Sequence, residues 1–110
     1  MDVQVFALDV LIKSANMTND PLDHEHVTLH IRNNPKIFSR INLFATPELY
    51  NPDLGLTLDE KADYILLKKI IEHFDEKNNP LFSCLDILKF LEKNQDLIKI
   101  NSHVARKGDT

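Results

Sequence analysis

Hydrophobic residues recur at helical spacing along most of this chain. The clearest case is residues 59–74, where apolar positions at i, i+3 and i+7 are flanked by lysine and glutamate. The same spacing predicts helices over 7–17, over 21–33 and after Ser83, with one more short turn within 94–101. The apolar stripe of the long helix consists of Tyr64, Leu67, Ile70, Ile71 and Phe74.

Capping residues and prolines mark where these helices begin and end. Asp20 followed by Pro21 is the favoured order of an N-cap and a first helical residue. This helix should end before Asn34, because the residue that precedes a proline is disfavoured in the helical region. Ser83 and Asp86 have the spacing of a capping box, with aspartate in place of the usual glutamate.

Short extended segments predict a small amount of β-structure. Residues 3–6 alternate and are rich in β-favouring side chains, and residues 56–58 are an apolar run before the long helix. Residues 36–45 also have an extended character. We therefore expect an α/β (or α+β) fold with two or three short strands and about four helices. Residues 1–105 would form a single domain and residues 106–110 a loose tail.

Composition excludes several classes of function. A net charge of −4 argues against a general nucleic-acid-binding protein. No apolar run is long enough to span a membrane. Cys84 is the single cysteine, so no intramolecular disulfide can form, which fits a cytoplasmic protein. Two glycines cannot build a Gly-rich phosphate-binding loop.

Four segments, taken in order, carry a resemblance to a known family. They are residues 2–6 (DVQVF), 23–28 (DHEHVT), 56–59 (LTLD) and 101–104 (NSHV). In order and spacing they resemble the C-terminal portion of the acylneuraminate and 3-deoxy-manno-octulosonate cytidylyltransferases, in the branch that includes spore-coat polysaccharide biosynthesis proteins. The resemblance implies part of a nucleotide-diphospho-sugar transferase-like fold. It also implies CTP and an acidic sugar as substrates of the intact enzyme, with Mg²⁺ as a cofactor only together with the missing nucleotide-binding part. The implied partner is a second copy of the chain, in a homodimer, or the missing N-terminal half.

The chain also departs from that family. His24 and Gly55 stand where the family commonly has arginine, and Gln4 replaces a glutamate. The family's CTP-binding loop, which contains arginine and serine and ends in a P-G-K-like turn, has no counterpart here. We therefore expect a C-terminal fragment of a cytidylyltransferase that is inactive alone, whether as a truncation, a split or decayed gene product, or a detached module. The alternative is a non-catalytic interaction or dimerisation module that retains the scaffold.

Asp59 is the candidate metal ligand. The resemblance implies that this aspartate helps to hold Mg²⁺ beside the nucleotide phosphates, an arrangement that suits a cation taking one or two carboxylates plus phosphate oxygens. From its position alone, Asp59 is expected to cap the long helix. The two roles are compatible.

The candidate substrate-binding residues are His26, Arg32 and Arg40. The resemblance implies a place for His26 near the sugar site or a dimer contact. Either arginine could meet a sugar carboxylate, because a guanidinium suits bidentate recognition, although each is also an ordinary solvated cation. On a continuous helix His26 and His30 would lie at i, i+4, a spacing that can chelate zinc, so a zinc site is the alternative for this segment.

Overall fold

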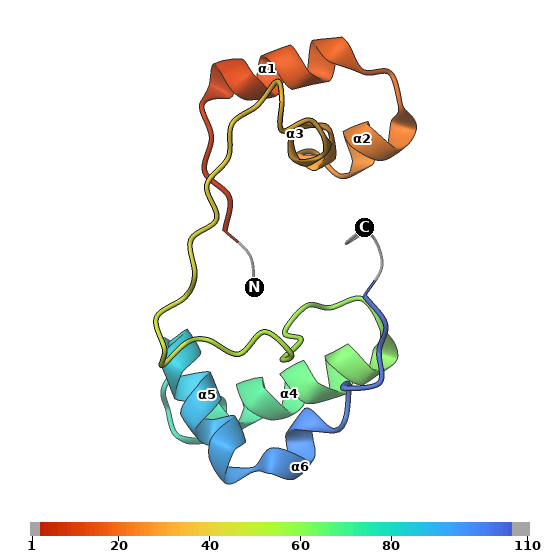
Figure 1. Ribbon diagram of the computed structural model, residues 1–110. Coiled ribbons are helices and arrows are strands. Elements are labelled where there is room, and N and C mark those ends of the chain that lie inside the picture. Colours follow the sequence, from red (N-terminus) through yellow and green to blue (C-terminus); the bar gives the residue numbers. More distant parts are fainter. Residues whose placement is uncertain (1–2, 107–110) are drawn as a thin grey trace. The chain divides into compact units, whose positions relative to one another are not determined.

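The computed structural model describes residues 3–106, and their regular structure is helical (Figure 1). The chain divides into two compact units, which we describe separately. Within the described residues, one unit spans 3–43 and the other 44–106. In order, the helices are α1 (Leu8–Met17), α2 (Pro21–Glu25), α3 (Leu29–Asn33), α4 (Lys61–Glu76), α5 (Cys84–Lys93) and α6 (Gln95–Ile98).

The predicted strands are absent from residues 3–106, so the α/β (or α+β) expectation is wrong for this part of the chain. Residues 3–6 find no neighbouring strand, and the side chains of Val3 and Val5 are 90% and 93% exposed. Residues 56–58 lie in an extended loop that leads to α4. A β-favouring sequence becomes a strand only when another strand accepts its backbone hydrogen bonds, and neither segment meets one.

The unit of residues 3–43 begins with the predicted helix α1, whose N-cap is Ala7. The predicted start of α2 is also confirmed, because an Asp20 carboxylate oxygen accepts the backbone N–H of Leu22 at 2.9 Å. Leu29 and Phe38 provide the buried apolar residues of this unit.

The predicted helix over residues 21–33 is interrupted, which corrects the sequence prediction. α2 ends at Glu25, and His26 leaves the helical region with φ −101° and ψ 69°. The β-branched pair Val27 and Thr28 follows, and such side chains are poor helix formers. α3 then starts at Leu29 and ends at Asn33, before Asn34 as predicted.

The unit of residues 44–106 has its core on one side of α4. Leu66, Ile70 and Phe74 are buried there against Leu91 of α5. Aromatic rings close the far end of this core, with Phe74 and Phe82 stacked at a centroid distance of 4.5 Å. Partly buried apolar residues complete the cluster: Leu54, Leu56, Phe82, Ile87, Phe90, Leu97, Ile98 and Ile100.

The buried side of α4 differs from the predicted stripe. Tyr64 and Ile71 are 56% and 54% exposed, whereas Leu66, which lies outside the predicted stripe, is fully buried. The buried positions also include the carboxylate of Asp63. The helix is therefore turned so that an acid, rather than Tyr64, faces the interior at its first turn.

The ends of α4 and α5 follow local rules. α4 stops where Asn78 adopts a left-handed φ of 52° and the backbone N–H of Asn79 donates to the carbonyl of Phe74 at 2.9 Å. The predicted capping box of α5 is confirmed. The backbone N–H of Ser83 donates to Asp86 at 2.9 Å, and the backbone N–H of Asp86 donates to the Ser83 hydroxyl at 3.1 Å.

We predict that Leu66→Ala lowers the free energy of unfolding by about 2–5 kcal/mol, because it leaves a cavity in the centre of the core. Ile71→Ala, a matched truncation on the exposed side of the same helix, should cost under about 1 kcal/mol. Urea titrations followed by circular dichroism measure both. Equal losses would show that the exposed side of α4 is covered by something else.

Candidate functional site

The carboxylate of Asp63 is the centre of the most connected polar cluster in residues 44–106. It lies in the first turn of α4 and is fully buried. Five N–H groups donate to its two oxygens. Oδ1 accepts from Asn101 Nδ2 at 2.8 Å and from Arg106 Nη2 at 2.8 Å, and Oδ2 accepts from Arg106 Nη1 at 2.9 Å, the Glu60 backbone at 2.9 Å and the Asp59 backbone at 3.1 Å.

Residues both near to and far from Asp63 in the sequence donate hydrogen bonds to its carboxylate. Asp63 is the third residue of α4, from where an acidic side chain can reach back to the free N–H groups that precede the helix. A buried charge requires a charged partner, and the guanidinium of Arg106 provides one in bidentate geometry. The hydrogen bonds from Arg106 and then Asn101 hold the pKa of the Asp63 carboxyl well below its usual range, although burial opposes them.

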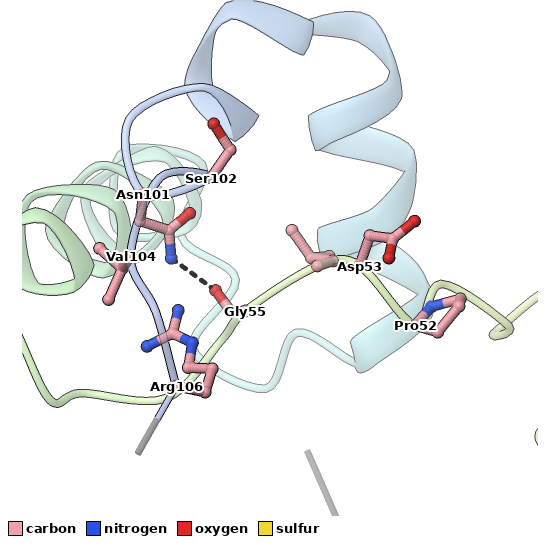
Figure 2. A pocket seen from close by; sticks show the side chains of 8 residues that line it. Pro52, Asp53, Gly55, Asn101, Ser102, Val104 and Arg106 are labelled. Atoms are coloured by element: carbon pink, nitrogen blue, oxygen red, sulfur yellow. Dashed lines mark hydrogen bonds between the residues drawn. The ribbon is translucent and has the colours of Figure 1, made fainter. Parts of the chain in front are cut away.

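Gly55 makes room for this arrangement. The guanidinium of Arg106 lies directly against its Cα, so an added Cβ would overlap Nη2 of Arg106 and lie 2.9 Å from its Cζ. The Gly55 carbonyl accepts a second hydrogen bond from Asn101 Nδ2 at 2.8 Å (Figure 2). Three separate segments, at residue 55, residues 59–63 and residues 101–106, are thereby joined through one carboxylate and one amide.

A small open cavity lies beside the cluster, between the segments 52–55 and 101–106 (Figure 2). Arg106 and Asn101 form part of its wall, and its volume is about 130 Å³. Pockets for nucleotides and similar ligands are usually about 300–1,000 Å³. The cavity therefore suits a water cluster or a small ion and is too small for a nucleotide.

Asp59, the predicted metal ligand, lies at the edge of the cluster. Its side chain is 63% exposed, and its Oδ2 is 3.7 Å from Arg106 Nη1. The N-cap of α4 is Glu60, one residue later than predicted, and it is the backbone N–H of Asp59 that is bound, by Asp63.

The described residues do not by themselves fit a magnesium ion. Mg²⁺ prefers an octahedron of oxygens, with one or two carboxylates among them. Here Asp59 offers one carboxylate whose near neighbour is the cation of Arg106, while both oxygens of Asp63 already accept N–H donors. Across residues 3–106, no three His, Cys, Asp or Glu side chains converge as a metal site would require.

The predicted substrate residues lie in the other unit, and two of them are in contact. Arg40 Nη1 donates to the backbone carbonyl of Arg32 at 2.9 Å. Nε of Arg32 is buried and has no hydrogen-bond partner within residues 3–106. His26 lies at the end of α2, as its C-cap residue.

The histidine segment does not have the helical i, i+4 geometry on which the zinc alternative depended. His26 caps α2 while His30 belongs to α3, because the helix breaks between them. His30 Nδ1 instead lies 3.5 Å from a carboxylate oxygen of Asp23, which also accepts the hydroxyl of Thr18 at 2.7 Å. His24 Nε2 lies 2.9 Å from the carbonyl of Thr18.

Sequence reasoning missed the roles of Asp63 and Arg106 and attached no chemistry to Asn101. The signal for Asp63 was present: an acid three residues after Glu60 and three before Leu66 occupies a capping position on the apolar side of the helix. Arg106, grouped with the tail from sequence, is anchored on that carboxylate. Residues 107–110 of the predicted tail lie outside the described residues.

Comparison with known proteins finds two curated proteins to which the chain is similar. It is 36% identical over 73 residues to the spore coat polysaccharide biosynthesis protein SpsF of Bacillus subtilis. These residues are 66% of this chain and 29% of SpsF. It is 33% identical over 105 residues to MJ1063 of Methanocaldococcus jannaschii, a protein named as uncharacterized. These residues are 96% of this chain and 42% of MJ1063. The chain thus spans less than half the length of these curated relatives.

Two further comparisons find no counterpart. No protein-family model matches the chain. No solved structure matches it either.

Among the helices of residues 3–106, none has the length and apolar character needed to cross a membrane.

We predict that stability falls as the pH drops below about 4, the ordinary value of an aspartate in an unfolded chain. The pKa of Asp63 is lower in the folded state, so the folded state favours the charged form, and this contribution is present above pH 4 and lost as the pH falls towards the folded-state pKa. Thermal melts between pH 7 and pH 3 measure it.

Asp63→Asn should lower Tm at pH 7 by about 10 °C or more, since Arg106 loses its charged partner, and should flatten the acid dependence. Asp96→Asn is the matched control, because the Asp96 side chain is 98% exposed, and it should behave like the wild type. The same acid dependence in all three proteins would contradict the assignment.

Proposed function

We propose that this chain is the C-terminal part of a CTP-dependent sugar cytidylyltransferase that acts in polysaccharide biosynthesis. The similarity to SpsF over two thirds of the chain is the observation that carries this proposal. The ordered segments that resemble the cytidylyltransferases support the reaction type, nucleotidyl transfer from CTP to an acidic sugar. Mg²⁺ and the homodimer belong to the same proposal.

The contact between Arg32 and Arg40 supports an acidic substrate. Both guanidinium groups belong to residues 3–43, and the side chain of Arg40 reaches back to the backbone of Arg32. Nε of Arg32 is buried without a hydrogen-bond partner within residues 3–106, and a guanidinium suits a carboxylate ligand because it can donate parallel hydrogen bonds to both oxygens. In this proposal they meet the carboxylate of the acidic sugar, with His26 from the end of α2 as a further sugar contact.

The nucleotide requires residues beyond those that the structure describes. The cavity beside Arg106 is too small for a nucleotide, and the carboxylate of Asp63 is fully engaged. Asp59 is an exposed acid of the cluster, and we assign it to the cofactor in the intact enzyme because the resemblance implies a metal ligand at this position. Any magnesium site there needs a further carboxylate or phosphate oxygens from elsewhere.

The second candidate function is a non-catalytic interaction or dimerisation module. It is favoured by the apolar side chains that remain exposed in residues 44–106, since exposed apolar area commonly marks an interface. On α4 these include Tyr64 and Ile71. Phe44 and Leu81 are 84% and 90% exposed.

A hybrid protein tests the enzymatic proposal. The 105 matched residues of MJ1063 are replaced by this chain, and pyrophosphate release is measured with CTP, Mg²⁺ and a panel of 2-keto sugar acids. We expect turnover by intact MJ1063 and by the hybrid, and none by this chain alone. Asp59→Asn in the hybrid should reduce turnover at least about 100-fold if Asp59 helps to hold the cofactor.

Two outcomes would contradict the proposal. The first is no pyrophosphate release by intact MJ1063 with any acidic sugar. The second is an active MJ1063 beside an inactive hybrid that is folded by circular dichroism. An active hybrid that tolerates Asp59→Asn would retain the reaction and remove Asp59 from it.

A further inference from the structure

Two carboxylates converge on a single nitrogen of Arg106. Nη1 donates to Asp63 Oδ2 at 2.9 Å and lies 3.7 Å from Asp59 Oδ2. The second terminal nitrogen, Nη2, binds the other oxygen of Asp63 at 2.8 Å. Asp59 and Asp63, at positions i and i+4 around the start of α4, thus share one positive charge.

The position of Arg106 is built into the surrounding chain. Its guanidinium fits against Gly55 only because that residue has no Cβ. Asn101 turns its amide N–H groups, rather than its oxygen, towards the carboxylate of Asp63 and the carbonyl of Gly55. The groups that point at the Asp63 oxygens are therefore N–H donors, which suit a carboxylate paired with arginine and leave no lone pair for a metal.

The positive charge of Arg106 also disfavours a divalent cation at Asp59. A divalent cation bound to Asp59 Oδ2 would lie within a few ångströms of the guanidinium, whose side chain is only 26% exposed. Like charges at that distance repel, and partial burial weakens the screening by water. Asp59 can therefore hold a divalent cation well only when Arg106 is elsewhere.

We propose that Arg106 is an internal cation held by both acids, so that Asp59 and Asp63 do not fit a divalent cation while Arg106 lies between them. This inference concerns residues of this chain alone and stands or falls independently of the cytidylyltransferase proposal.

Manganese is the probe for this proposal, because it resembles Mg²⁺ in its ligands and broadens nearby NMR signals. Amide spectra of the ¹⁵N-labelled chain are recorded during a Mn²⁺ titration. In the wild type, signals of residues 59–63 should broaden no earlier than those near Asp96, an exposed acid of the same unit. In Arg106→Gln they should broaden at a Mn²⁺ concentration at least about tenfold lower.

Two variants serve as controls. Arg106→Lys keeps the positive charge and should behave like the wild type. Asp59→Asn combined with Arg106→Gln should lose the selective broadening, which assigns the site to Asp59. Excess Mg²⁺ should reverse the broadening in Arg106→Gln.

Selective broadening in the wild type at the same Mn²⁺ concentration as in Arg106→Gln would overturn the proposal. So would a folded Arg106→Gln variant without selective broadening. If that variant does not fold, Gly55→Ala decides the matter, because its Cβ displaces the guanidinium while the charge stays in the chain. Wild-type broadening in Gly55→Ala would then overturn the proposal.

Discussion

The buried carboxylate of Asp63 is the interaction on which the structure of residues 44–106 depends. Its five N–H partners come from the start of α4 and from the segment after α6, and Asn101 extends the same network to Gly55. Breaking one charged bond would leave a buried charge without its partner, so these contacts are expected to form and break together. The apolar core that α4 shares with α5 also fixes the side of α4 that faces inwards.

The two acids at the start of α4 have different surroundings. Asp63 is buried and satisfied, whereas Asp59, one turn earlier, is exposed beside the same guanidinium. The cavity next to Arg106 is too small for a nucleotide, and the chain spans less than half the length of the curated relatives it matches.

Local features were predictable from the sequence, and distant pairings were not. The caps at Asp20 and Ser83 depend on residues two or three positions away, and both were found. The partners of Asp63 are 38 and 43 residues distant, which no local pattern reveals. The predicted stripe therefore included the buried Ile70 and Phe74 but also the exposed Tyr64 and Ile71, and it missed the buried Asp63 and Leu66. The strand predictions failed for a related reason, because β-propensity does not say whether a partner strand exists.

Amide hydrogen exchange at the start of α4 tests the central role of Asp63 most directly. The N–H groups of Asp59 and Glu60 precede the first helical residue, yet both donate to Asp63. We expect them to be protected from exchange in the wild type and to lose that protection in Asp63→Ala, while the amides of α5 retain more of theirs. Unchanged protection at Asp59 and Glu60 in Asp63→Ala would contradict the account.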